Sequence, residues 1–283
     1  MKISHTFKAL RQDINPDATR KFVDFSLPSL PMVEACRADD FDFFQPFIAA
    51  GSLTIEQMRH ACQRYHLGKT KSGQPIFWMI DDMFTPLDAH IGGTWISTLL
   101  KAREPLIASW RVEHCLFGLH LLFEEGGGRN EEGDYSKHYK WTPADNSTCT
   151  NPAALNISPS TLHLPPSTKS VAVVESEKTA VILSELFPES IWMAYATTSH
   201  LTPDLFAPLQ GCTVILYPRT DPTLSTFLFF EELAALVRQH YDLDITVDTT
   251  LEDHATDEQK DRCIDLVDFL FVTQRSSSAR LLP

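Results

Sequence analysis

Four short apolar runs that alternate with helical patterns dominate the second half of this chain. The runs are residues 171–174, 190–196, 212–218 and 244–248. Helical patterns separate them at 176–186 and 223–241, a shorter helical turn precedes Gly211, and a last helix is expected over 257–274. Apolar runs between helices are typical of strands that are buried on both faces of a parallel sheet. We therefore predict an α/β fold, with the four runs as adjacent, mostly parallel strands and with helices on both faces.

The composition of the chain divides it into four parts. Residues 1–40 are polar and rich in proline, and they predict an N-terminal arm. Residues 41–125 predict an α+β region. Residues 126–168 are rich in Gly, Pro, Ser, Thr and Asn without any periodicity, which indicates a surface-lying, mobile insertion or linker. Residues 169–283 hold the predicted parallel sheet.

Two local patterns define the predicted α+β region. Apolar residues at helical spacing predict a helix at Ile55, Met58, Cys62 and Tyr65. Gly68 suits the C-terminal end of that helix. The segment that follows predicts a β-hairpin with its turn at Ser72-Gly73 and an apolar strand from Ile76 to Ile80.

The charge balance limits how this chain can meet nucleic acid or a membrane. It has 24 Lys and Arg against 37 Asp and Glu, a formal net charge of −13, which disfavours non-specific attraction to phosphates. Any contact with DNA or RNA must therefore be local, metal-bridged or supplied by a partner protein. No run approaches the ~20 apolar residues of a membrane span. The 6 cysteines form no CxxC pair, so we expect a cytoplasmic protein with reduced thiols and no membrane contact.

Acidic residues gather where the predicted strands end. They are Glu175 and Glu177 after the first run, Asp221 after the third, and Asp265 and Asp268 in the last helical segment. Ligands bind at the carboxyl ends of strands in open α/β sheets. Carboxylate oxygens are the ligands that Mg²⁺ prefers, and the ion can stabilise charge in phosphoryl transfer. The alternative is an ordinary helix start, where carboxylates stabilise the helix dipole by about 0.3–1 kcal/mol each.

Several motifs occur in the order in which one protein family carries them. They are "RYHLG", "IFWMID", "TWISTLLK", "CLFGLHLL", "VESEKTAVI", "IWMA" and "DLVDFL". Together they resemble the Toprim domain shared by bacterial primases, topoisomerases and related nucleases. The resemblance is closest to primase-like Toprim proteins of bacterial mobile elements, a family usually called uncharacterised. It spans residues 40–123 and 169–272, and it implies a Toprim-like fold for the C-terminal part.

The resemblance also implies roles for individual residues. Glu175 matches the Toprim glutamate, a proposed general acid/base or metal ligand, and Asp221 falls in the acidic pair expected after the third strand. Asp265 or Asp268 matches a later acidic position. The resemblance thus makes Glu175 and Asp221 candidate catalytic residues, and all four residues candidate ligands of Mg²⁺. Arg219 departs from the pattern, since it stands where the first aspartate of the pair is expected.

Three functions follow from these patterns. The first is a nucleic-acid-associated Toprim protein of primase type, with Mg²⁺-dependent phosphoryl transfer through Glu175 and Asp221. The second is a catalytically inactive Toprim module that serves as a binding or assembly partner in mobile-element replication or mobilisation. An Arg219 that points into the site and pairs with Glu175 would favour this second function. The third is an unrelated α/β protein that binds a small phosphate ligand.

Basic residues near these motifs are candidate contacts for DNA or RNA. Lys178 and Arg219 lie at the predicted edge of the parallel sheet, and Lys69 and Lys71 lie in the predicted hairpin. An exposed lysine in the first turn of a helix is an equally good interpretation of Lys178. The sequence therefore predicts local contacts and no extended basic surface.

Overall fold

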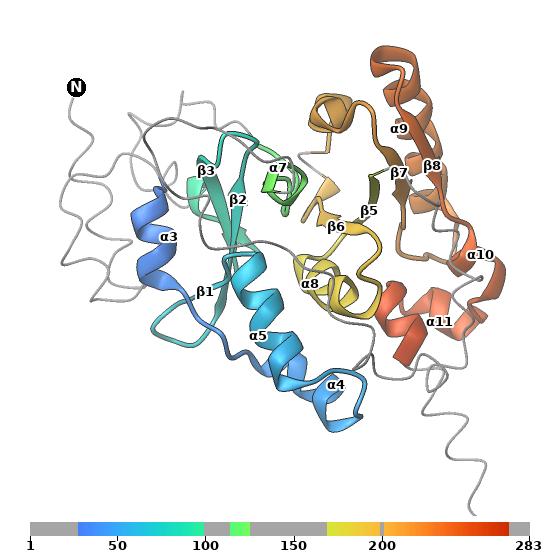
Figure 1. Ribbon diagram of the computed structural model, residues 1–283. Helices are drawn as coiled ribbons and strands as arrows, with labels where there is room; N and C mark the ends of the chain where they lie inside the picture. Colours follow the sequence, from blue (N-terminus) through green and yellow to red (C-terminus); the bar gives the residue numbers. More distant parts are fainter. Residues whose placement is uncertain (1–27, 99–113, 125–168, 199–200, 272–283) are drawn as a thin grey trace, which may run out of the picture. The chain divides into compact units, whose positions relative to one another are not determined.

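The computed structural model describes residues 28–98, 114–124, 169–198 and 201–271 (Figure 1). The described residues form two compact units, one from residues 28–45, 55–98 and 114–124, and the other from residues 46–54, 169–198 and 201–271. The predicted insertion at 126–168 lies outside the described residues, as does most of the predicted arm at 1–40.

The second unit is built on a parallel sheet of order β6-β5-β7-β8. Its strands are β5 (Ser170–Val174), β6 (Ile191–Ala194), β7 (Thr213–Leu216) and β8 (Asp244–Val247). β5 pairs with β6 on one side and β7 on the other, and β7 pairs with β8, all in parallel. The predicted sheet is confirmed. Every residue of β5 and β6 is buried, as expected for apolar strands covered on both faces.

Helices connect the four strands in sequence order. They are α8 (Glu177–Leu186) between β5 and β6, the 3₁₀ helix η6 (Pro203–Leu209) between β6 and β7, and α9 (Ser225–Tyr241) between β7 and β8. Crossovers between parallel strands are right-handed. From β5 the chain crosses the sheet in one direction to β6, and from β6 it crosses in the other direction to β7 and β8. Right-handed connections therefore place α8 on one face and η6 and α9 on the opposite face. In agreement, α9 contacts both η6 and β8.

The end of the second unit differs from the prediction of one long helix. The structure has α10 (Thr250–His254), α11 (Asp257–Asp261) and a separate helical segment at 266–271. Thr256 begins α11 with a capping box that it shares with Gln259. Cys263, at a φ of 50°, interrupts the helical path between the two last segments. Among the described residues, no helix is both long and apolar enough to cross a membrane.

The first unit contains an antiparallel sheet of order β1-β2-β3-β4. Its strands are β1 (Gly68–Lys69), β2 (Pro75–Ile80), β3 (Pro86–Ile91) and β4 (Thr94–Trp95). The predicted hairpin is confirmed as β1 and β2, with Gly68 opposite Ile76. β3 and β4 were not expected from the sequence, and together with the hairpin they complete the N-terminal α+β part.

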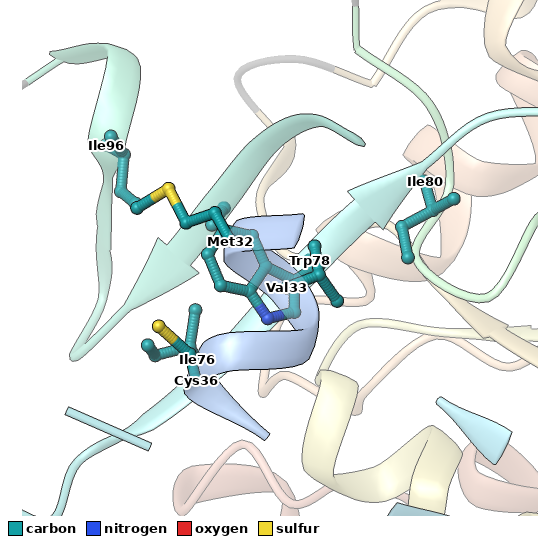
Figure 2. Close-up of a cluster of buried hydrophobic side chains, with 8 residues drawn as sticks. Met32, Val33, Cys36, Ile76, Trp78, Ile80 and Ile96 are labelled. Atoms are coloured by element: carbon teal, nitrogen blue, oxygen red, sulfur yellow. The ribbon is translucent and has the colours of Figure 1, made fainter. Parts of the chain in front are cut away.

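Helices pack on this sheet and close its core. The described helices of this unit are α3 (Leu30–Cys36), the 3₁₀ helix η1 (Asp42–Phe44), α5 (Ile55–Arg64) and α7 (Leu121–Glu124), whereas α4 (Gln45–Ala49) belongs to the second unit from Pro46 onward. α5 confirms the predicted helix, but Gly68 does not end it. Instead His66 takes the left-handed conformation at a φ of 51°. Figure 2 shows Met32, Val33 and Cys36 of α3 around the buried ring of Trp78 on β2.

Candidate functional site at the switch point of the parallel sheet

The strand order of the parallel sheet determines where a ligand can bind. From β5 the chain crosses to β6 on one side, and it then crosses back beyond β5 to form β7. Connections of opposite direction make the carboxyl ends of β5 and β7 the switch point, the place where open α/β sheets bind ligands. Glu175 directly follows β5, and Arg219 lies shortly after the end of β7. The topology thus brings these two residues to the predicted edge.

Glu175 and Arg219 form an ion pair at this switch point. The Nε of Arg219 lies 3.1 Å from Oε2 of Glu175, with 47% of the Arg219 side chain and 24% of the Glu175 side chain exposed. Within the described residues, Arg219 makes no other hydrogen bond or ion pair. Nearly half of the Arg219 side chain is therefore open to solvent beside the pair.

Burial and two neighbouring carboxylates disfavour the ionised form of Glu175, and Arg219 favours it. Burial raises the pKa of the Glu175 carboxyl, Arg219 partly opposes this rise, and the negative charges of Asp265 and Glu177 add to it. A cation close to a carboxylate lowers its pKa, and like charges raise it. Glu175 is therefore held between one guanidinium and two further carboxylates.

Asp265 is the second acidic residue that the structure brings to this site. It lies within electrostatic range of Glu175, and Thr179 of α8 donates a hydrogen bond from its hydroxyl to the Asp265 carboxylate. The amide of Asp268 donates to the other Asp265 oxygen at 2.9 Å. Burial raises the pKa of Asp265, and these hydrogen bonds oppose the rise. The side chain of Asp268 is exposed to solvent.

The carboxylate of Asp221 accepts hydrogen bonds from the residues at the start of α9. It accepts hydrogen bonds from the backbone amides of Thr223 (2.8 Å), Ser225 (3.2 Å) and Thr226 (2.6 Å). The hydroxyls of Thr223 and Ser225 donate to it as well. Burial alone would raise the pKa of Asp221, but the bonds from Thr223 and Thr226 outweigh burial and hold it well below its usual range. Asp221 therefore stabilises the N-terminus of α9 as a charged cap.

Sequence reasoning missed Tyr195, which follows β6. The residue is 5% exposed, and its ring packs against Phe230 of α9 with the ring centroids 5.3 Å apart. Its hydroxyl has no hydrogen-bond partner in the described part of the chain. Burial raises the pKa of Tyr195, the charge of Glu175 adds to the rise, and the charge of Arg219 opposes it. The backbone amide of Tyr195 donates to the carbonyl of Val174 at 3.2 Å, which places the residue next to Glu175 in the sheet.

The turn after β6 also lies against the site. The amide of Ala196 donates to the backbone carbonyl of Glu175 at 2.9 Å, and Ala196 has a φ of 60°. Thr197 and Thr198 continue this turn, with Thr198 exposed. The sequence places Tyr195 at the end of an apolar run, but its position next to Glu175 depends on the pairing of β5 with β6.

The predicted basic contacts fall into different surroundings. Lys178 is exposed in the first turn of α8, near the switch point. In the first unit, Lys69 forms an ion pair with Asp40 at 2.7 Å and lies over the ring of Phe41. Lys71 is exposed in the turn of the hairpin. Lys69 thus has a local structural role, and Arg219 and Lys178 are the basic candidates at the sheet edge.

The predicted metal ligands do not form one cluster. Within residues 28–98, 114–124, 169–198 and 201–271, no group of three or more His, Cys, Asp or Glu side chains is arranged to hold a metal ion. Glu175 and Asp265 lie near each other, while Asp221 accepts bonds from the α9 backbone and Asp268 faces solvent. The site is an ion pair with a neighbouring carboxylate and a buried hydroxyl.

Comparison with known proteins adds a family match over part of the chain. A family described as "Domain of unknown function (DUF6371)" matches residues 160–220, a segment that contains both Glu175 and Arg219. Neither the curated proteins nor the solved structures yield a match to this chain. The function of the chain is therefore inferred from the geometry of the switch point.

Proposed function

We propose that this chain is a catalytically inactive Toprim-like module that acts as a binding or assembly partner in the replication or mobilisation of a bacterial mobile element. The observation that carries this proposal is the ion pair between Arg219 and Glu175. In the Toprim pattern, position 219 holds an aspartate that helps to bind a metal ion. A guanidinium at this position supplies positive charge where a metal site requires negative charge.

The donor set at this edge does not fit Mg²⁺. The charge of Glu175 is compensated by Arg219, and the carboxylate of Asp221 is saturated by donors from the start of α9. Two unit charges 4 Å apart repel by about 1 kcal/mol in water and by about 4 kcal/mol at an effective dielectric constant near 20, and a divalent ion doubles these values. Even the aqueous value weakens Mg²⁺ binding by more than about tenfold.

The overall charge supports a role that depends on partners. At a formal net charge of −13 the chain repels the phosphate backbone, because non-specific binding relies on Lys and Arg. The basic candidate Lys69 is already paired with Asp40. A partner protein or a single local contact is therefore a better match to this surface than a long track of nucleic acid.

Calorimetric titration of Mg²⁺ and Mn²⁺ tests this proposal. We expect no measurable binding by the wild-type chain and a gain of binding in Arg219→Asp, which removes the cation and adds a carboxylate. Arg59→Asp is the matched control, because Arg59 is an exposed arginine of α5 in the first unit. Tight binding by the wild-type chain that does not change in Arg219→Asp would contradict the proposal.

One observation favours a second candidate, an active Mg²⁺-dependent phosphoryl-transfer enzyme of primase type. Asp265 lies within electrostatic range of Glu175, so two of the predicted ligands are neighbours. In this alternative a substrate displaces Arg219 from Glu175 and frees both carboxylates. The same titration, repeated with a single-stranded oligonucleotide present, distinguishes the two functions, because only the enzyme gains metal affinity when the oligonucleotide is added.

A further inference from the structure

The guanidinium of Arg219 keeps hydrogen-bond donors that its ion pair with Glu175 does not use. Nε of the guanidinium lies 3.1 Å from Oε2 of Glu175, and nearly half of the Arg219 side chain is exposed. Within the described residues, its Nη1 and Nη2 have no hydrogen-bond partner. The outer edge of the guanidinium is a planar fork of donors, and this fork matches two oxygens of a phosphate or carboxylate group.

Glu175 keeps the fork in one orientation. It directly follows β5, whose five residues are all buried, and its backbone carbonyl accepts the amide of Ala196 at 2.9 Å. The carboxylate that holds Nε is therefore attached to a fixed part of the sheet. A guanidinium that is ordered before the ligand arrives loses less side-chain entropy on binding.

Two further features at the switch point suit an anionic ligand. α8 begins beside Glu175 and has 10 residues, and its N-cap residue Ser176 makes no side-chain hydrogen bond to the helix. The positive end of a helix dipole favours an anion there. Independently, the hydroxyl of Tyr195 is buried without a partner in the described residues, and the backbone amide of Tyr195 donates to the carbonyl of Val174, the residue before Glu175, at 3.2 Å. A buried hydroxyl without a partner is costly unless a ligand or water satisfies it.

We propose that Arg219, positioned by Glu175, is a metal-independent receptor for a terminal phosphate group. The group can come from the 5′ end of a nucleic acid strand or from a free nucleotide, which share this chemistry. This inference rests on the proposed function, since it assigns a ligand to the same inactive site. Arg219 is the binding residue and Glu175 is the positioning residue.

The number of free oxygens favours a terminal phosphate over a phosphodiester within a continuous backbone. Glu177, Asp265 and Asp268 lie near the pair or in the adjoining segment. They repel further phosphates of a strand that would run across the site. A terminal phosphate presents its charge and its free oxygens at one point, where the guanidinium can bind two of them. A phosphodiester has fewer free oxygens and brings neighbouring charges with it.

Fluorescence anisotropy in the presence of EDTA tests this inference on the full chain. The probes are a short single-stranded oligonucleotide with a 5′-phosphate, the same strand with a 5′-hydroxyl, and adenosine 5′-monophosphate as a competitor. We expect the wild-type chain to bind the phosphorylated strand at least about tenfold more tightly than the hydroxyl strand. Arg219→Lys keeps the charge but removes the fork, and it should abolish this preference. Arg59→Lys, the same change at an exposed arginine of α5 in the first unit, should preserve it.

Each outcome decides a specific point. Displacement by adenosine 5′-monophosphate at a similar concentration supports the receptor and identifies a free nucleotide as the source. Binding that requires the phosphorylated strand supports the receptor and identifies a nucleic acid end. Equal binding of the two strands, no binding of either, or an unchanged preference in Arg219→Lys overturns the inference. Because EDTA removes divalent ions, this result is independent of the metal titration that tests the proposed function.

Discussion

Removal of the Asp221 carboxylate should destabilise the second unit without affecting ligand binding at Arg219. The carboxylate is 8% exposed and accepts three backbone amides and two hydroxyls at the start of α9. Loss of a helix cap costs about 0.5–2 kcal/mol, and a lost hydrogen bond to a charged group costs about 1.5–3 kcal/mol. Asp221→Ala should therefore lower the free energy of unfolding by about 2–4 kcal/mol. Asp221→Asn, which retains an acceptor oxygen, should cost less.

The pH dependence of this effect has a definite sign. Hydrogen bonds from Thr223 and Thr226 hold the pKa of Asp221 below its usual range in the folded chain, against the effect of burial. A carboxyl with a lowered pKa stabilises the fold above the pKa of the unfolded chain, about 3.9, and this contribution is lost as the pH falls towards the folded pKa. The stability difference between wild type and Asp221→Asn should therefore be constant from pH 7 to about 5 and shrink below about 4.

Urea denaturation followed by circular dichroism measures both effects, and Asp261→Asn at an exposed position of α11 is the matched control. Phosphate binding by Asp221→Asn should equal that of the wild-type chain. The charged Asp221 carboxylate does not stabilise the second unit if Asp221→Ala is as stable as the wild type. The same conclusion follows if the stability difference between the wild type and Asp221→Ala does not depend on pH down to 3. A large loss of phosphate or metal binding with unchanged stability would assign Asp221 to the ligand site.

Two further predictions concern other contacts. In Arg219→Gln the pKa of the Glu175 carboxyl should rise above its already raised wild-type value, because Arg219 opposes the effects of burial, Asp265 and Glu177. Carbon-detected NMR titration of the glutamate carboxyls measures this pKa. An unchanged or lower pKa would refute the ion pair in solution. Gly68→Ala should destabilise the first unit by about 1–3 kcal/mol, since a Cβ there would lie 3.0 Å from Nε1 of Trp78 and 3.3 Å from Cβ of Cys36. Thermal unfolding measures this loss, and a variant as stable as the wild type would show that the packing around Gly68 can adjust.

The parallel sheet could be predicted from sequence because its strands are continuous apolar runs. Val171–Val174 and the run around Trp192 have the composition of strands that are buried on both faces, and the helices between them fix the parallel direction. β3 lacked such a signal, since it begins at Pro86 and includes Asp88. Asp88 is buried there because it accepts the amides of Ala89 and Ser97, and a sequence alone does not reveal these partners.

The candidate site could be predicted in part. Its location followed from the strand pattern, and pairing of Arg219 with Glu175 was one of the two arrangements that the sequence allowed. The capping role of Asp221 had a readable signal, because Thr223 and Ser225 follow it directly before a helix. The position of Tyr195 beside Glu175 could not be predicted from the sequence, because it depends on the parallel pairing of β5 with β6.

The central position of β5 also has a consequence for how the second unit folds. Val171 pairs with Ile191 on one side and with Val214 on the other, and the second partner is about twice as far along the chain. Doubling a loop adds about 0.6 kcal/mol to the entropy cost of closing it. The β5-α8-β6 segment therefore has the lower entropic barrier and should form first, with β7 docking afterwards. Since Arg219 arrives with β7, the ion pair closes late, and Glu175 is in place before its partner reaches it.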